Sequence, residues 1–278
     1  MIAITGATGS IGGRVAQLLA DLSPRLVVRD PARAPATSGD VHRASYDDRA
    51  AAEAALAGVE TLLLVSAAES ATRRDEHRTM VEAAAAAGVR HLVYTSFVAA
   101  APDASFTLGR DHWHTEDAIR TAAAATGLTF TLLRDNFYLD VLPLFADASG
   151  VIRGPAGDGR LAAVARADVA DVAAVVLRAP EAHAGAVYEL TGPEALDLHE
   201  VATRAGAVLG RTLTYQPETL EEAYASRRAA YPGTPDWQLD AWVSTYTSVA
   251  DGSMAHVTED VQKVTGRKAR TLEETLGG

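Results

Sequence analysis

The chain has no cysteine among its 278 residues, and this absence removes several kinds of chemistry. It can form no disulfide, no thiolate metal site, no iron–sulfur cluster and no cysteine nucleophile. Any oxidation or reduction that the protein performs therefore needs a redox carrier borrowed from solution.

Lysine is almost as scarce, since the only lysines are Lys263 and Lys268 near the C-terminus. The formal net charge at pH 7 is −11. Because contact with a phosphate backbone requires clustered Lys and Arg side chains, we expect no nucleic-acid partner.

The sequence also lacks an apolar stretch near the length that a bilayer requires, so we expect no membrane partner. The first expected strand begins at Ile2, which leaves no room for a signal peptide. These observations predict a soluble, cytoplasmic protein. The sequence leaves a homodimer open.

A glycine loop at the N-terminus is the most informative pattern that is present. Gly6, Gly9 and Gly12 follow the apolar segment 2–5 and lead into apolar residues at helical spacing. A helix start offers unpaired N–H groups and a positive dipole end, and glycines let a pyrophosphate come close to them. The pattern predicts a dinucleotide site; the alternative is an ordinary helix start whose glycines serve packing alone.

The first half of the chain alternates strand and helix patterns, and its strands are apolar throughout. Such alternation predicts an α/β fold of Rossmann type, a doubly wound parallel sheet. Strands are expected at 2–5, 25–29, 61–66, 91–96 and 129–134, with helices at 11–22, 48–57, 73–87 and 111–126.

Beyond Arg134 the pattern changes, and we expect a smaller, mostly helical C-terminal lobe that binds substrate. The dinucleotide-binding domain is assigned to 1–135 and 162–192, and the lobe to 136–161 and 193–278. The elements expected beyond Arg134, in the lobe and in 162–192, are a helix at 137–148, a hairpin of strands 151–153 and 161–165, a helix at 168–177 with Asp168 as its N-cap, a strand at 186–191 that could extend the sheet, and mainly helices from Leu198 onward.

Arg29 ends the second expected strand, where an acidic residue would bind the adenosine ribose of NAD. A guanidinium there suits a 2′-phosphate, and Arg33 could supply a second donor. We therefore expect NADP(H) as the cofactor. In the alternative, both arginines are solvated loop charges and Asp30 neutralises Arg29.

Polar residues at other strand ends extend this candidate site. Val65-Ser66 and Thr95-Ser96-Phe97 fall at the carboxyl edge of the sheet, where ligands bind, although hydroxyl residues also form turns there. Asp47 is expected to be a helix N-cap, and a contact with adenine is the alternative.

His112 and Glu116 are four residues apart, so the carboxylate could orient the imidazole at the cleft, or both could form an exposed pair. His114 points elsewhere on the helix, and no histidine cluster has zinc spacing, so no metal is expected. Phe137 and Tyr138 could offer an aromatic wall to a planar ligand, or pack in the core.

With these motifs in this order, the chain resembles the NmrA-like branch of the atypical short-chain dehydrogenase/reductases over nearly its full length. Within that branch it is most similar to the type 2 NAD(P)H:quinone oxidoreductases. The residues that carry the resemblance are Gly6 to Gly13, Arg29, Tyr94-Thr95-Ser96, His112 to Glu116, Leu133 to Tyr138 and Thr265-Gly266-Arg267.

The resemblance implies an NADP-binding domain and a small substrate lobe. The residues that it places in the cofactor site are Thr8, Ser10, Ile11, Arg29, Ser66, Thr95 and Ser96. The substrate is expected against Phe97, Asn136, Phe137 and Tyr138.

The Tyr-x-x-x-Lys pair of the wider superfamily is absent, since no lysine occurs before position 263. A quinone accepts hydride without a strong acid, so we expect an NADPH-dependent reductase of quinones or similar electrophilic carbonyls, without flavin. His112 or Tyr138 is the expected proton donor. The alternatives are a non-catalytic redox sensor that binds NADP and, less favoured, an isoflavone-reductase-like enzyme.

Overall fold

The computed structural model describes residues 1–36 and 39–278. Its contacts divide the chain into two compact units. The first comprises Met1–Phe97, Asp111–Arg134 and Val169–Tyr188, and the second comprises Val98–Arg110, Asp135–Asp168 and Glu189–Gly278.

Within the described residues, one sheet has seven strands in the order β3-β2-β1-β4-β5-β6-β9. They are β1 (Ile2–Thr5), β2 (Arg25–Val28), β3 (Val41–Arg43), β4 (Thr61–Leu64), β5 (His91–Phe97), β6 (Thr129–Asp135) and β9 (Val187–Leu190). The pairs from β3 to β5 are parallel. An order of 3-2-1-4-5-6 that reverses between β1 and β4 is the Rossmann arrangement, which confirms the expected fold class.

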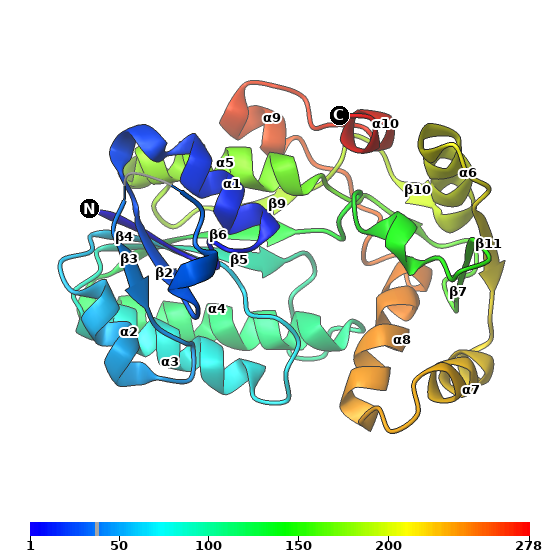
Figure 1. The fold of residues 1–278 in the computed structure, drawn as a ribbon, viewed down its shortest axis with the longest axis horizontal. Helices are drawn as coiled ribbons and strands as arrows, with labels where there is room; N and C mark the ends of the chain where they lie inside the picture. Colours follow the sequence, from blue (N-terminus) through cyan, green and yellow to red (C-terminus); the bar gives the residue numbers. More distant parts are fainter. Residues whose placement is uncertain (37–38) are drawn as a thin grey trace. The chain divides into compact units, whose positions relative to one another are not determined.

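Helices cover both faces of this sheet (Figure 1). Helices α1 (Ser10–Leu18) and α5 (Arg166–Arg178) lie on one face, and α2 (Arg49–Leu56), α3 (Arg73–Ala86) and α4 (Thr107–Thr126) lie on the other. The Arg178 guanidinium donates to the Leu18 carbonyl oxygen at 2.9 Å, which joins α5 to α1.

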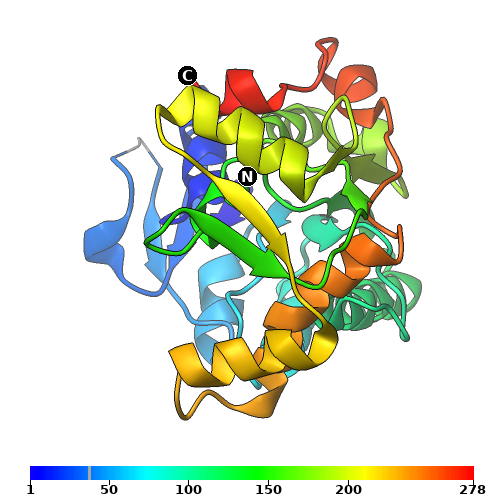
Figure 2. The same cartoon turned by 90° about the vertical axis from the view of Figure 1, so that its right-hand side faces the viewer.

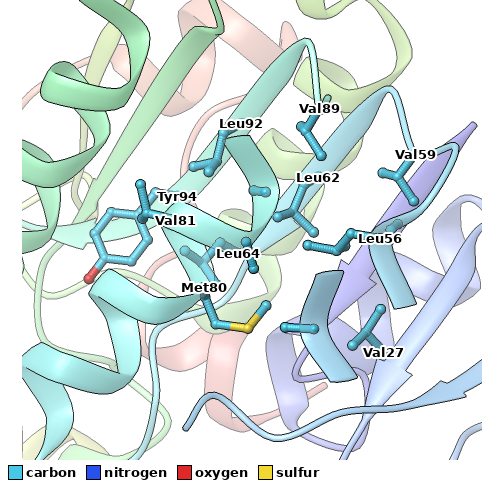
Figure 3. Close-up of a cluster of buried hydrophobic side chains, with 14 of the residues drawn as sticks. Val27, Leu56, Val59, Leu62, Leu64, Met80, Val81, Val89, Leu92 and Tyr94 are labelled. Carbon is cyan, nitrogen blue, oxygen red and sulfur yellow. The ribbon is translucent and has the colours of Figure 1, made fainter. Parts of the chain in front are cut away.

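The core of the first unit lies between the sheet and helices α2 and α3 (Figure 3). Leu62 and Leu64 of β4 meet Met80 of α3 and Leu56 of α2, and all four are fully buried. All four residues of β4 are buried, as a strand covered on both faces must be. This packing fixes the strand ends that carry the candidate site.

The second unit contains two small strand pairs and several helices. Strand β7 (Val151–Gly154) pairs in parallel with β11 (Thr214–Pro217), and β8 (Arg160–Leu161) pairs antiparallel with β10 (Leu196–Asp197). Its helices are α6 (Leu198–Leu209), α7 (Leu220–Ala230), α8 (Asp236–Ala250), α9 (Asp260–Thr265) and α10 (Leu272–Leu276). Figure 2 shows α6 beside β11.

Several local expectations are wrong. Residues 151–153 and 161–165 form no hairpin, because each of the two strands there pairs with a later segment. The expected helix at 137–148 is reduced to the 3-10 turn η3 (Leu142–Phe145), where Pro143 lacks a donor. Helix α5 begins at Arg166, so Asp168 is not its N-cap.

The remaining differences are short elements. Strand β3 was not expected, and α1 ends at Leu18 before a 3-10 turn η1 (Ala20–Leu22). Two further 3-10 turns are η2 (Pro31–Arg33) and η4 (Pro180–His183). No helix in the described part of the chain has the length and apolar character needed to span a bilayer.

Candidate functional site

The loop between β1 and α1 forms a tight turn that a side chain would block. Gly6 has a φ of 61°, and the Gly9 N–H donates to its carbonyl oxygen at 2.9 Å. A Cβ on Gly12 would lie 2.5 Å from that same oxygen, closer than real contacts allow. Glycine at 12 therefore lets the helix approach the turn.

The N-terminus of α1 is open to an anion. Its N-cap, Gly9, places no side chain over the helix start, and no acidic residue lies in the first turn. Thr8, Gly9 and Ser10 line an open cavity of about 430 Å³, and Arg33 contributes to the same wall. Backbone donors, the helix dipole and a guanidinium together suit a diphosphate or phosphate group. Four of the expected cofactor residues thus meet in one cavity.

Arg29 is exposed directly after β2. The Asp30 carboxylate accepts the Ala32 N–H and caps η2, and among the described residues no ion pair joins it to Arg29. Within residues 1–36 and 39–278, no hydrogen bond or ion pair engages the Arg29 guanidinium. Asp47 is not an N-cap, because Asp48 caps α2, and a hydrogen bond from Ser45 lowers the pKa of Asp47.

The expected hydroxyls at the strand ends are engaged by the protein itself. The Ser66 N–H donates to Thr95 Oγ1 at 2.8 Å. Ser96 is buried and its hydroxyl donates to Glu116 Oε1 at 2.6 Å. Thr95 therefore links two strand ends, and Ser96 links β5 to α4. The expected contact of these hydroxyls with the cofactor stays a prediction.

The expected pairing of His112 with Glu116 is wrong. Arg134 binds both oxygens of the Glu116 carboxylate, at 2.8 and 2.7 Å, and Arg120 donates to Oε2 at 2.9 Å. Burial acts to raise the pKa of Glu116, but the hydrogen bonds from Arg134 and Ser96 hold it below its usual value. Glu116 is thus a buried, charged anchor.

His112 has other partners. Its Nε2 lies 3.0 Å from Arg73 Nη2 and its Nδ1 lies 2.9 Å from the Tyr94 hydroxyl, while Phe97 stacks on the ring. A guanidinium only donates, so Nε2 must accept and Nδ1 carries the proton. Burial, with Arg73 and His77 nearby, lowers the pKa of His112 well below its usual value. His112 is neutral and locked, which makes it a weak acid.

Three expected substrate residues lie in the second unit. The Asn136 amide donates to the Met254 carbonyl at 3.0 Å and accepts the Phe137 N–H at 2.7 Å, so it is largely occupied. Phe137 is buried with its ring 5.2 Å from that of Phe106. The half-buried Tyr138 bonds the buried Asp135. Their contact with substrate stays a prediction.

Asp135 is buried, and one of its two carboxyl oxygens accepts a hydrogen bond in the described part of the chain. The Tyr138 hydroxyl donates to Oδ2 at 2.9 Å, whereas Oδ1 has no hydrogen-bond partner among the described residues. Burial raises the pKa of Asp135 well above its usual value, and the bond from Tyr138 lowers it only in part. Asp135 therefore keeps its proton to a higher pH than an ordinary carboxyl does.

The sequence reasoning missed four residues, namely Tyr46, Arg73 and His77 of the first unit and Asp135 of the second. Arg73 and His77 stand four apart at the start of the expected helix 73–87, directly after a strand-end loop, and that spacing was a usable signal. Tyr46 follows the unexpected β3, so nothing in its neighbourhood indicated a strand end. Among the described residues no group of three His, Asp or Glu side chains could hold a metal ion.

Comparison with known sequences yields strong matches. A model of the NmrA-like family matches residues 1–274. Quinone oxidoreductase 2 of Escherichia coli is 36% identical over 286 residues, a match that covers 99% of this chain and 97% of that protein.

Solved structures of similar proteins also match this chain over nearly its full length. The NADPH-dependent quinone oxidoreductase of Escherichia coli, complexed with NADPH, matches with a TM-score of 0.88 and 35% identity over 99% of this chain and 98% of that one. The Citrobacter triphenylmethane reductase, complexed with NADP(H), matches with a TM-score of 0.85 and 30% identity over 99% of both chains. Both similar proteins are reductases solved with the phosphorylated nicotinamide cofactor.

Proposed function

The chain belongs to the NmrA-like family, and on this premise we propose that it is an NADPH-dependent oxidoreductase that transfers hydride directly to a quinone or a similar electrophilic carbonyl, without flavin. The observation that carries the proposal is the open cavity at the glycine loop with Arg33 in its wall. The names of the similar proteins, a quinone and a triphenylmethane reductase, support a planar conjugated substrate.

The residues present fit a dinucleotide. The uncapped start of α1 and the close approach permitted by Gly12 suit its diphosphate, and Arg29 with Arg33 suits a 2′-phosphate. Bound NADPH would supply a hydride from its nicotinamide. The remaining proposed neighbours are Ile11, Asp47, Val65, Ser66, Thr95, Ser96 and Phe97.

A proton must also reach the reduced substrate, and Tyr138 is the better of the two proposed donors. Tyr138 is half-buried and its hydroxyl bonds Asp135, a carboxyl whose pKa is raised, whereas His112 is buried and both its ring nitrogens are engaged by Arg73 and Tyr94. No lysine precedes Lys263, so an alcohol dehydrogenase pair is lacking. A quinone suits this site because its ring spreads the charge that hydride transfer creates.

The reductases among the similar proteins do not favour the alternative of a non-catalytic redox sensor. Residence in the cytoplasm, a homodimeric state and the absence of a nucleic-acid partner stay predictions from the sequence.

The test is NADPH oxidation by protein shown to be free of flavin, with a panel of small benzoquinones. The absorbance of NADPH should fall faster than in the same mixture with heat-denatured protein. Bound NADPH without acceleration by any quinone would contradict the proposed activity and favour the sensor.

A further inference from the structure

The segment that follows β4 is held by side chains from four other parts of the first unit. The Val65 N–H donates to Thr5 Oγ1 at 3.0 Å, and the Tyr46 hydroxyl donates to the Val65 carbonyl oxygen at 2.6 Å. The next N–H, that of Ser66, donates to Thr95 Oγ1 at 2.8 Å. The ends of β1 and β5, together with Tyr46 three residues after β3, thus fix the first half of the segment.

The second half is held from α3. The Ala67 N–H donates to His77 Nε2 at 2.8 Å, and Arg73 Nε donates to the Ala67 carbonyl oxygen at 3.0 Å. Arg73 and His77 lie one helical turn apart and are 4% and 0% exposed. Two buried side chains therefore grip both polar groups of a single peptide residue, an arrangement that we call the Ala67 clamp.

One backbone group of the segment has no hydrogen-bond partner in the described part of the chain. No hydrogen bond from the described residues reaches the carbonyl oxygen of Ser66, which lies between the two held residues. Ser66 is half-buried, at the carboxyl edge of the sheet beside the reversal between β1 and β4. Doubly wound sheets bind their ligands at this edge.

On the premise of the proposed function, we propose that Arg73 and His77 are positioning residues. They hold the Ser66 carbonyl as an acceptor for a hydroxyl or amide N–H of bound NADPH. The contact would be made by backbone, so the side chains that secure it lie behind the site. The clamp orders the segment in the unbound protein. Binding of NADPH then requires no further loss of conformational entropy in this segment, which favours affinity.

The protonation state of His77 fits this role. Nε2 accepts a backbone N–H, so the proton sits on Nδ1, which lies 2.8 Å from Thr115 Oγ1. The Thr115 hydroxyl in turn donates to the Asp111 carbonyl at 2.9 Å. Burial first, and the Arg73 charge second, lower the pKa of His77 well below its usual value. The acceptor is thus available at neutral pH.

The two amide substitutions of His77 separate its two contacts. The oxygen of His77→Gln can take the place of Nε2 and keep the Ala67 bond, whereas His77→Asn reaches only the Nδ1 position and keeps the Thr115 contact. We expect His77→Asn to raise the Kd for NADPH roughly tenfold, about 1.4 kcal/mol, with kcat at saturating NADPH unchanged. His77→Gln should bind NADPH like the wild type.

The matched control is His91→Asn. His91 is also buried and bonds two threonines, Thr129 and Thr131, away from the clamp. It should lower the melting temperature and leave the Kd unchanged. Equal Kd values for folded His77→Asn and the wild type, or an equal loss in His77→Gln, would overturn the inference.

A second measurement needs no variant. Hydrogen exchange of the Ala67 amide in the wild type without nucleotide should be slow, because the clamp exists before binding. Fast exchange that slows only with NADPH would overturn the inference. Failure of the wild type to bind NADPH contradicts the proposed function instead, and binding without quinone reduction leaves the clamp intact.

Discussion

At the scale of single residues, the proposed cofactor preference rests on Arg29, whose guanidinium is exposed and bound by no described residue. Asp30, the obvious neutralising neighbour, is occupied by the backbone of η2. An uncompensated guanidinium at the end of the second strand favours a phosphate on the adenosine ribose.

Replacing Arg29 by Ala should weaken NADPH binding by about 1–3 kcal/mol, because a charge-assisted bond to the 2′-phosphate is lost. NADH, which has no such phosphate, should bind as before. Titrations of both nucleotides check this, with the exposed Arg78→Ala as control. Equal losses for the two cofactors would refute the assignment.

Asp135 gives a second prediction. The unfolded carboxyl ionises near pH 4, whereas the folded one keeps its proton to higher pH, so stability falls as pH rises from about 4 to the folded pKa. Asp135→Asn cannot ionise. The free energy of unfolding of Asp135→Asn minus that of the wild type should therefore increase by about 1.4 kcal/mol per pH unit in that window.

Denaturant unfolding of both proteins between pH 4.5 and 8, a range set by the ordinary carboxyl pKa of about 4, measures this difference. A difference that stays constant with pH would show that Asp135 is ionised in the fold.

Residue identities could be predicted only where the sequence neighbourhood defines the role. The glycines and Arg29 belong to one local unit of strand, loop, helix and strand, so their spacing indicated the candidate site. The partners of His112 come from β5 and from the start of α3, and helical spacing wrongly favoured Glu116. Contacts between distant segments leave no such local trace.

At the scale of elements, long apolar strands and amphipathic helices were predictable because burial imposes their period. Short elements were not. Strand β3 has three residues, and β7 finds its partner more than sixty residues later in β11, where a hairpin was expected. The pairing of such short strands depends on the helices packed around them.

The turn between β1 and α1 is the element on which the site depends. In Gly12→Ala the new Cβ would lie 2.5 Å from the Gly6 carbonyl oxygen, so α1 must move away from the turn. We expect a loss of stability of about 1–3 kcal/mol and a loss of NADPH affinity measurable by titration.

Gly109→Ala in α4 is the control, since its Cβ would meet nothing closer than 3.4 Å. It should keep NADPH affinity. Unchanged affinity in Gly12→Ala would mean that the turn is not where the diphosphate binds.

At the scale of the whole molecule, the buried histidines predict an acid-sensitive fold. The folded pKa values of His77 and His112 lie well below those of the unfolded chain, so only the unfolded chain gains protons as pH falls below about 6.5. Each histidine should then lower the free energy of unfolding by about 1.4 kcal/mol for each pH unit of acidification. Asp135 offsets part of this loss, because its raised pKa in the fold adds stability as the pH falls.

Free energies of unfolding between pH 5 and 7, which bracket the ordinary histidine pKa, check this prediction. His77→Gln should show a shallower slope than the wild type. Stability that is flat or rises on acidification would contradict neutral histidines in the fold.

The proposed function depends above all on a nucleotide site that prefers the phosphorylated cofactor. Calorimetric titration of the wild type with NADPH and with NADH tests it most directly. We expect saturable heat with NADPH and an affinity for NADH at least roughly tenfold lower, a difference of about 1.4 kcal/mol. No heat with either nucleotide, or equal affinities, would contradict a site that selects NADPH.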